Sequence, residues 1–468
     1  MTLPGQQCSV TDSHGASNYK SFPANVLRMS GQQQASRPTD DSRAFPHWHD
    51  PGKEALEIVE GDGAYVTAAD GRTYLDFIAQ LYCVNAGHGN EAIIESIEEQ
   101  LRNVQYVSSA KHNDARSELA GRLAEVAPEG LTDVLFSISG SEANEAAAQF
   151  AREYTDSNKI LTRWRSYHGA TYGAGSFTGD PQTRAPIERH AATTGSGKFL
   201  PPLPRAFGTD DPQELADQAI DHLRFVIHNE DPDSIAAILM EPVGGTSGAY
   251  PAPADYFQQL RELCDEYGIL LISDEVIAGF GRCGDWFGIG TEDVAPDMIT
   301  FAKGVTSAYI PLAGVVARQD IAEHFEKEGF PLGQTFSGHP VACAAGLAAV
   351  EEYENGLIDN VADHAGYFES QLRELEDKYD EVCDVHGRGY LWGVEFADPA
   401  TGEPFVDPRV TDEDNPVDDV LSATRERGVL CGSARPNTQV VISPPLTVGE
   451  AEIDEGVTAL DEAIAEVF

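Results

Sequence analysis

The feature that most constrains the fold is an alternation of short apolar runs and amphipathic stretches between about residues 90 and 350. The runs before Asp274 (Gly-Ile-Leu-Leu-Ile-Ser) and before Lys303 (Asp-Met-Ile-Thr-Phe-Ala) have the length and composition of buried strands in a parallel sheet. Strands that alternate with helices indicate βαβ units. The sequence therefore predicts an α/β protein with a mostly parallel, doubly wound sheet.

The flanking segments predict a second, smaller α+β domain built from both chain ends. Between Ala55 and Phe77, alternating residues broken by Gly-Asp-Gly and Asp-Gly-Arg predict an antiparallel meander. After about residue 356, helices and strands follow without the regular alternation. We expect an N-terminal arm (1–45), the N-terminal part of the small domain (46–89), the large domain (90–353) and the C-terminal part of the small domain (354–468).

Asp274 and Lys303 each stand just beyond a predicted strand. Ligands of open α/β sheets bind beyond the carboxyl ends of the strands, so an acid and a lysine there can face one bound molecule. Pyridoxal 5′-phosphate (PLP) requires this pair, because a lysine forms a Schiff base with its aldehyde and a carboxylate holds its pyridine nitrogen protonated. Lys303 is one of only eight lysines, which favours a function over a solvated cap.

Three other predicted strands end in polar or glycine-rich groups. Gly140 and Ser141 open an Ala-rich helix, where backbone N–H groups can bind a phosphate, although a simple N-cap explains them equally well. Tyr167 and His168 lie in a glycine turn, where an aromatic ring can cover a planar cofactor, or where the turn is merely a surface feature. Glu241 is either a site residue or a strand terminator.

Two motifs suggest other chemistry and are discounted. Gly279–Gly284 fits the Gly-x-Gly-x-x-Gly dinucleotide pattern, but no helix is predicted directly after it, so a dehydrogenase is disfavoured. His47-Trp48-His49-Asp50 has no further clustered ligands, and no metal site is expected.

The charge excludes several classes of partner. There are 31 basic and 77 acidic residues, a net charge of −46 that is spread along the chain. Nucleic acids and anionic membranes need a positive surface, so neither is an expected partner. Such a charge is typical of adaptation to molar salt, the alternative being an ordinary acidic protein. The chain has no long apolar run or signal peptide, and its seven cysteines lack Cys-x-x-Cys spacing, so we expect a cytoplasmic protein with reduced thiols.

These residues resemble a known family, the class III PLP-dependent aminotransferases. The similarity covers roughly residues 45 to 465 and rests on six strings in order and spacing: Ser139-Gly-Ser-Glu-Ala-Asn-Glu, Tyr167-His-Gly-Ala-Thr, Glu241-Pro, Ser273-Asp-Glu-Val-Ile-Ala-Gly-Phe-Gly-Arg282, Ala302-Lys-Gly304 and Thr335-Phe-Ser-Gly-His-Pro340. The resemblance implies PLP fold type I.

The resemblance also implies roles for individual residues. Lys303 corresponds to the Schiff-base lysine that shuttles the proton, and Asp274 to the partner of the pyridinium nitrogen. Val276 and Tyr167 are expected on opposite faces of the cofactor ring, Gly140 and Ser141 at its phosphate, and Glu241 in the network around it. Thr335 corresponds to a residue that reaches the phosphate of the other subunit, which implies a homodimer with shared sites, with a tetramer also open.

Two further strings resemble pyruvate-dependent ω-aminotransferases. Asp76–Asn85 is similar to their substrate-pocket segment, where many have Trp in place of Tyr82, and Arg435–Leu446 is similar to their mobile-arginine segment. Arg435 would bind a substrate carboxylate with two hydrogen bonds and move aside for other side chains. The alternative for Arg435 is a surface ion pair, and Asn437-Thr438 replaces a more usual Gly-Asp in this loop.

The sequence thus predicts a ping-pong transamination between an amine donor and a keto acid acceptor, with pyruvate as the expected acceptor. The alternatives are a 2-oxoglutarate-dependent ω-aminotransferase, an aminomutase or a decarboxylating transaminase. A non-catalytic PLP-binding homologue is the alternative from a different class.

Overall fold

The computed structural model describes residues 55–190, 195–329, 333–411 and 413–468. The predicted N-terminal arm (1–45) and the His47–Asp50 motif lie outside these residues. Residues Glu57–Phe468 form one compact unit. The division of this unit into a large and a small domain stays a prediction.

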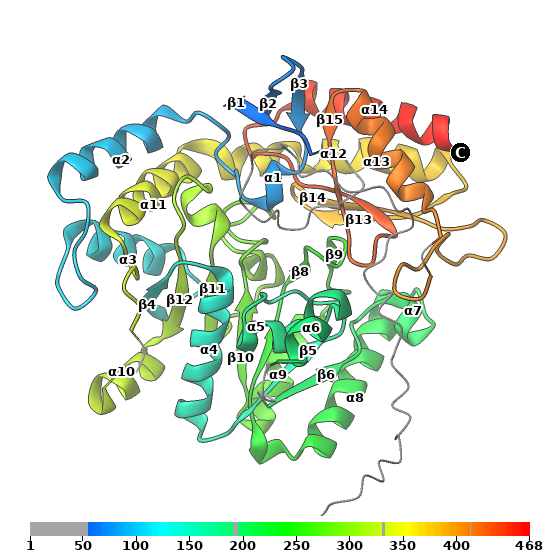
Figure 1. Ribbon diagram of the computed structural model, residues 1–468. Coiled ribbons are helices and arrows are strands. Elements are labelled where there is room, and N and C mark those ends of the chain that lie inside the picture. The colour runs from blue at the N-terminus through cyan, green and yellow to red at the C-terminus, as the bar shows by residue number, and fades with distance from the viewer. Residues whose placement is uncertain (1–54, 191–194, 330–332, 412) are drawn as a thin grey trace, which may run out of the picture. The chain divides into compact units, whose positions relative to one another are not determined.

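A seven-stranded sheet forms the centre of this unit (Figure 1). Its strand order is β4 (Leu131–Ser137), β12 (Ala313–Arg318), β11 (Met298–Phe301), β10 (Leu270–Asp274), β7 (Ile235–Met240), β5 (Lys159–Arg163) and β6 (Ser196–Phe199). Only β12 runs antiparallel to its neighbours, so the predicted mostly parallel sheet is confirmed.

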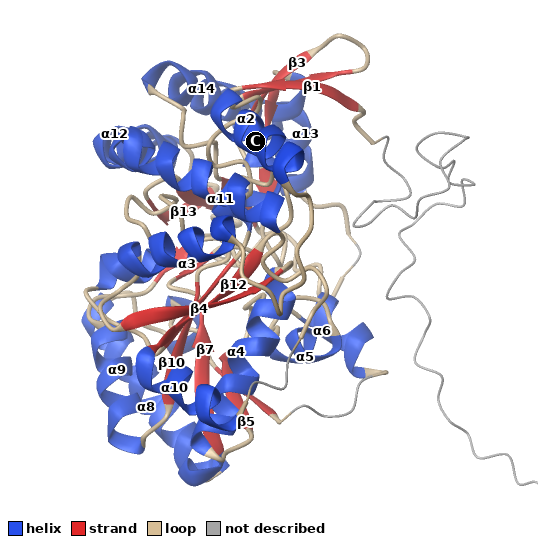
Figure 2. Cartoon of the chain, turned by 90° about the vertical axis from the view of Figure 1, so that its left-hand side faces the viewer, coloured by secondary structure: helices blue, strands red, loops and turns tan. Residues whose placement is uncertain are grey.

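Helices cover both faces of this sheet (Figure 2). Alternate residues of each strand point to opposite faces, and on β7 the side chains of Ala237 and Leu239 belong to one buried cluster while Ile238 and Met240 belong to another. The first cluster includes α4 (Gly140–Thr155) and α10 (Gln319–Glu328). The second includes α3 (Asp114–Val126), α8 (Pro212–Glu230), α9 (Tyr256–Tyr267) and α11 (Pro340–Glu352). This two-sided cover makes the sheet doubly wound.

Two four-stranded sheets are built from the remaining segments. The predicted meander is present as β1 (Ile58–Asp62), β2 (Tyr65–Ala68) and β3 (Thr73–Asp76), and β15 (Val429–Leu430) adds to β3 in parallel. The other sheet has the order β13 (Val382–Arg388), β14 (Leu391–Phe396), β17 (Gln439–Ile442) and β16 (Gly432–Ser433). The pairing of β3 with β15 joins segments from the two ends of the described chain, as the sequence predicts.

The remaining elements are mostly short. The helices are α1 (Ala79–Tyr82), α2 (Glu91–Asn103), α5 (Tyr172–Phe177), α6 (Pro181–Glu188), α7 (Pro204–Phe207), α12 (Ile358–Lys378), α13 (Pro416–Glu426) and α14 (Glu450–Val467). Single turns are η1 (Pro232–Ser234), η2 (Gly288–Glu292), η3 (Lys303–Thr306) and the π-helical η4 (Tyr353–Leu357), and β8 (Val243–Gly244) pairs with β9 (Tyr250–Pro251).

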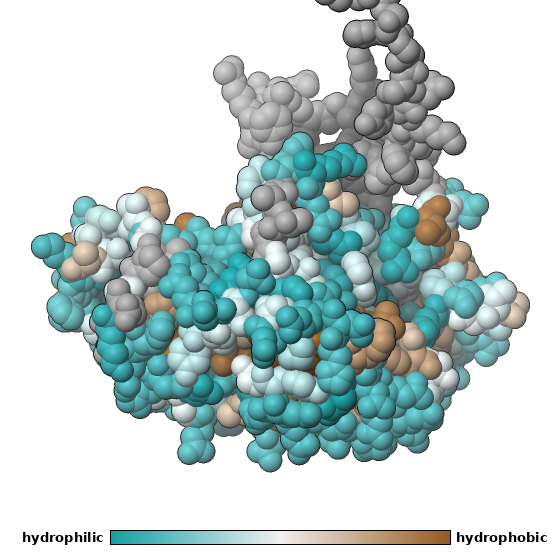
Figure 3. All heavy atoms as spheres, turned by 90° about the horizontal axis from the view of Figure 1, so that it is seen from below, coloured by the Kyte–Doolittle hydropathy of each residue, from teal (hydrophilic) through white to brown (hydrophobic). Residues whose placement is uncertain are grey.

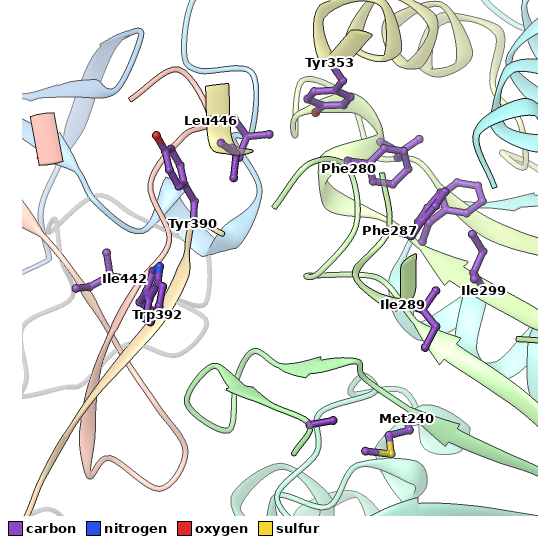
Figure 4. Packing of buried hydrophobic residues seen from close by; sticks show 14 of the residues in the cluster. Met240, Phe280, Phe287, Ile289, Ile299, Tyr353, Tyr390, Trp392, Ile442 and Leu446 are labelled. Carbon is purple, nitrogen blue, oxygen red and sulfur yellow. The ribbon is translucent and has the colours of Figure 1, made fainter. Parts of the chain in front are cut away.

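A cluster of buried aromatic rings supports the turn that carries Lys303 (Figure 4). The ring centre of Phe280 lies 5.5 Å from that of Phe287 and 6.0 Å from that of Tyr353. The Tyr353 hydroxyl donates a hydrogen bond to the carbonyl of Gly304. A Cβ atom at Gly304 would lie only 2.9 Å from Cβ of Phe280, so the turn packs directly on the cluster.

The surface of the described residues is largely hydrophilic, as expected from the acidic composition of the chain. The face shown in Figure 3 is dominated by hydrophilic residues, with hydrophobic ones in small patches. Among the described helices, none is both long and apolar enough to cross a membrane.

Candidate active site

The residues singled out in the sequence gather at one edge of the central sheet. Strands β10 and β11 are parallel neighbours, with Asp274 opposite Thr300, so Asp274 and Lys303 follow adjacent strands at the same end. Strands β5 and β7 run in the same direction and lead into Tyr167 and Glu241.

Asp274 is buried and held by three donors. Its Oδ2 accepts a hydrogen bond from Nδ2 of Asn144 at 2.8 Å and pairs with Nδ1 of His168 at 2.7 Å. Its Oδ1 accepts from the backbone N–H of Val276 at 3.1 Å. The amide of Asn144 also donates to the carbonyl of His168 at 2.9 Å and accepts from Oγ1 of Thr300 at 2.7 Å. This network fixes the carboxylate in place, and sequence reasoning did not identify Asn144.

Lys303 begins η3 in a left-handed conformation, with φ of +47°. Its ammonium lies 5.2 Å from the ring centre of Tyr82. Burial lowers the pKa of Lys303, and the nearby carboxylates of Asp274 and Glu241 oppose this shift only in part. A lowered pKa leaves a larger fraction of the amine neutral near neutral pH, as a nucleophilic lysine requires.

Gly140 and Ser141 form the first turn of α4, and the N-cap is Ser139, whose hydroxyl accepts from the N–H of Glu142 at 3.3 Å. The first backbone N–H groups of a helix have no intrahelical acceptor and attract anions. A Cβ atom on Gly140 would lie 3.0 Å from Cγ2 of Val276, so these two residues are in close contact. The helix N-terminus expected to bind the phosphate is therefore adjacent to Val276, the residue expected to cover the cofactor ring.

Tyr167 and Glu241 are linked directly. The backbone N–H of Tyr167 donates to Oε1 of Glu241 at 3.3 Å, and Oε2 of Glu241 accepts from Nη2 of Arg163 at 2.8 Å. Both members of the Arg163–Glu241 ion pair are buried. Removing one partner of a buried ion pair costs about 3–5 kcal/mol, so Glu241 is a structural anchor of the Tyr167 turn.

Tyr82 and Arg435 lie at the border of the same region. Tyr82 is buried, and burial raises its pKa to about 12 against the opposing charge of Arg435. The guanidinium of Arg435 lies 5.9 Å from the ring centre of Tyr167. Its Nη1 donates to Oγ1 of Thr183 at 2.9 Å and lies 3.6 Å from Oδ2 of Asp180. Asp180 and Thr183 were not identified from the sequence.

Among the described contacts, none joins Thr335 to the other candidate residues. It is exposed, and its carbonyl accepts a hydrogen bond from the hydroxyl of Tyr106 at 3.0 Å. Phe336 beside it is 54% exposed. Arg116 of α3 stabilises this region, because its guanidinium donates to the carbonyls of Gly338 at 2.8 Å, Lys111 at 2.8 Å and Val107 at 3.1 Å.

The glycine-rich Gly279–Gly284 motif does not open a helix. These residues form turns, in which Phe280 N–H donates to the carbonyl of Trp286 at 2.6 Å and Gly281 N–H to that of Asp285 at 3.1 Å. A phosphate site of the dinucleotide-binding type needs a helix N-terminus directly after the glycines, so the interpretation of this motif as accidental is confirmed.

Comparisons with known proteins agree with this geometry. A family model described as aminotransferase class-III matches residues 47–464. The chain belongs to this family. It is 34% identical over 446 residues to the diaminobutyrate–2-oxoglutarate transaminase of Halomonas elongata, covering 91% of this chain and 92% of that protein. It is also 34% identical over 441 residues to the putrescine–pyruvate aminotransferase of Pseudomonas aeruginosa, covering 89% and 92%.

Solved structures extend the agreement to the fold of this class III aminotransferase. The taurine:2-oxoglutarate aminotransferase of Bifidobacterium kashiwanohense, solved with PLP and glutamate, superposes with a TM-score of 0.86 at 34% identity, covering 90% of this chain and 95% of that one. The predicted PLP fold type I and the predicted enzyme class are therefore confirmed.

Proposed function

We propose that this class III aminotransferase uses PLP to move an amino group from an amine or ω-amino acid to a keto acid, with pyruvate as the acceptor, in a ping-pong cycle. The observation that carries this proposal is the placement of Lys303 and the anchored carboxylate of Asp274 at the ends of two adjacent parallel strands. The α4 N-terminus lies against Val276, two residues beyond Asp274.

The residues present fit PLP. A carboxylate with three donors stays in position to pair with a protonated ring nitrogen. The first turn of α4 offers backbone N–H groups at Gly140 and Ser141 to a phosphate. Tyr167 and Val276 supply an aromatic and a branched side chain to cover the two ring faces.

When bound, PLP supplies an aldehyde and an electron-withdrawing ring. Lys303 supplies the amine, and its lowered pKa lets Nζ accept a proton and return it. The carboxylate of Asp274 would stabilise the positive charge on the protonated ring nitrogen of PLP. The hydrogen bonds from Asn144 and His168 keep this carboxylate oriented. Arg435 binds and orients a substrate carboxylate, and the ring of Tyr82 limits the space beside Lys303.

The exposure of Thr335 supports a homodimer with shared active sites. A threonine and a phenylalanine exposed side by side, on a turn clamped by Arg116, suit a surface that a second subunit covers. In this proposal Thr335 reaches the phosphate bound by the partner. The net charge of −46 supports a cytoplasm of high salt as the working environment.

The relatives favour two acceptors. The putrescine enzyme named above uses pyruvate, whereas the diaminobutyrate and taurine enzymes use 2-oxoglutarate, so 2-oxoglutarate is the second candidate. The amine-loaded enzyme should be mixed with each keto acid in turn in molar KCl, and the cofactor spectrum followed. Recovery of the original spectrum with 2-oxoglutarate but not with pyruvate would contradict the proposed acceptor.

The same spectra distinguish transamination from a non-catalytic role, and analysis of the amine products distinguishes it from aminomutase activity. A non-catalytic homologue predicts no spectral change after an amine is added, and an aminomutase predicts an isomerised amine without a keto acid partner. The Lys303→Ala variant should lose turnover and the absorbance of the lysine-bound cofactor. Transamination retained by this variant would refute the assignment of Lys303.

A further inference from the structure

The side chain of Arg435 has a defined resting place on α6. Its Nη1 donates to Oγ1 of Thr183 at 2.9 Å and lies 3.6 Å from Oδ2 of Asp180. The backbone is anchored separately, because the N–H of Arg435 donates to the carbonyl of Thr246 at 2.8 Å. The guanidinium can therefore leave Thr183 without moving the main chain.

Asp180 is buried, with 4% of its side chain exposed. It caps α6 by accepting from the N–H of Gln182 at 3.2 Å and of Thr183 at 3.0 Å. The Thr183 hydroxyl donates to Oδ2 of Asp180 at 2.8 Å. A hydroxyl has one proton and two lone pairs, so Thr183 donates to the carboxylate while it accepts from Arg435.

The contact of Arg435 with Thr183 and Asp180 is weak enough for a substrate carboxylate to replace it. Arg435 makes one hydrogen bond to a neutral oxygen there, and the carboxylate is too distant for the two parallel bonds that guanidinium and carboxylate groups prefer. The side chain of Arg435 is 28% exposed, and ion pairs that solvent reaches are worth about 0.2–1 kcal/mol. A substrate carboxylate with two free oxygens can compete with Asp180 for Arg435.

We propose that Asp180 and Thr183 hold Arg435 when the substrate has no carboxylate, and thereby set the preference between carboxylate-bearing and carboxylate-free substrates. This inference rests on the proposed transamination. Asp180 and Thr183 are positioning residues, since they act through Arg435. Without them Arg435 leaves α6 more often, which helps substrates that carry a carboxylate and hinders amines that need an uncharged pocket.

The Asp180→Asn variant removes the charge and replaces one of the two acceptor oxygens at the helix cap with an NH2 donor. The KM for pyruvate should fall about three- to fivefold and the KM for 1-phenylethylamine, a carboxylate-free donor, should rise by a similar factor. Since Lys303 is untouched, kcat should stay the same. Thr183→Val should act in the same direction, and Thr183→Ser should restore wild-type values.

A binding measurement gives a second readout. Titration calorimetry of the PLP-loaded protein, which cannot aminate a keto acid, with pyruvate should give a dissociation constant that falls by the same factor in Asp180→Asn. Asp211→Asn is the control for the loss of a charge at a helix cap before proline: Asp211 is exposed, and its Oδ1 alone accepts from the N–H groups of Gln213 and Glu214. No described contact joins Asp211 to Arg435, and this variant should match the wild type.

Two outcomes overturn the inference. A pyruvate KM that rises in Asp180→Asn would mean that the position against Thr183 is itself the carboxylate-binding position. If the KM values for both substrates and the dissociation constant for pyruvate are the same in Asp180→Asn as in the wild type, Asp180 has no influence on Arg435. Absence of turnover with every amine and keto acid in the wild type would instead refute the proposed function, and the calorimetry would still decide on Asp180.

Discussion

Asn144 provides the strictest test of how Asp274 is held. Asn144→Ala removes the hydrogen bonds from Nδ2 to Asp274 and to the His168 carbonyl, and the one that Oδ1 accepts from Thr300. A hydrogen bond to a charged group contributes about 2 kcal/mol and each of the other two about 1 kcal/mol. Ala is favoured over Asn within a helix by roughly 0.6 kcal/mol. We expect a loss of about 3 kcal/mol in the free energy of unfolding.

The assay is urea unfolding of the cofactor-free protein at fixed protein and salt concentration, followed by fluorescence of the four tryptophans. Gln149→Ala is the control on the same helix, because this amide bonds only to the exposed Glu153 in the described contacts. It should stay within about 0.5 kcal/mol of the wild type. An Asn144→Ala protein within that same margin would refute the view that this amide anchors Asp274.

Three further predictions concern the proposed phosphate site, the Thr335 turn and the half-buried Lys198. Gly140→Ala should weaken PLP affinity severalfold, measured by fluorescence titration, since its Cβ would lie 3.0 Å from Cγ2 of Val276; unchanged affinity would contradict the close packing. Arg116→Lys should raise the dissociation constant of PLP as much as Thr335→Ala does, because an ammonium cannot reach all the carbonyls that the guanidinium binds. A dissociation constant equal to that of the wild type would show that Arg116 does not influence the binding of the phosphate. Burial lowers the pKa of Lys198 from 10.5 to about 7. Between about pH 7 and 10.5 the unfolded chain therefore binds more protons than the folded protein. The free energy of unfolding rises with pH in this range, because the cost of burying a charged Lys198 is lost. Lys198→Met should be stabilised relative to the wild type most at pH 6.5 and least at pH 10 in urea titrations, and a constant difference would refute the shift.

The sequence was sufficient to predict the sheet and the residues at its edge. Strand ends are local features, and the parallel direction of β10 and β11 brings Asp274 and Lys303 together without further information. The Ala-rich helix after Gly140 also contains a signal that could have revealed Asn144. This residue is polar among alanines on the buried face of α4, where a polar side chain needs a partner.

Other contacts depend on long-range geometry and leave no mark in the sequence. Arg163 ends β5 and Glu241 directly follows the neighbouring strand β7, so the two side chains meet only once the sheet forms. Asp180 caps α6 like any Asp before Pro, as Asp211 does on α8, and only the fold places it beside Arg435. The sequence pattern therefore locates the proposed catalytic pair, whereas the side chains that hold or adjust it come from tertiary packing.

The most direct test of the central claim is to locate the covalent attachment of the cofactor. Borohydride reduction of the PLP-loaded protein, followed by digestion and mass spectrometry, should find the reduced cofactor on Lys303 alone among the eight lysines. A label on any other lysine, or a loaded protein without a label, would contradict the account.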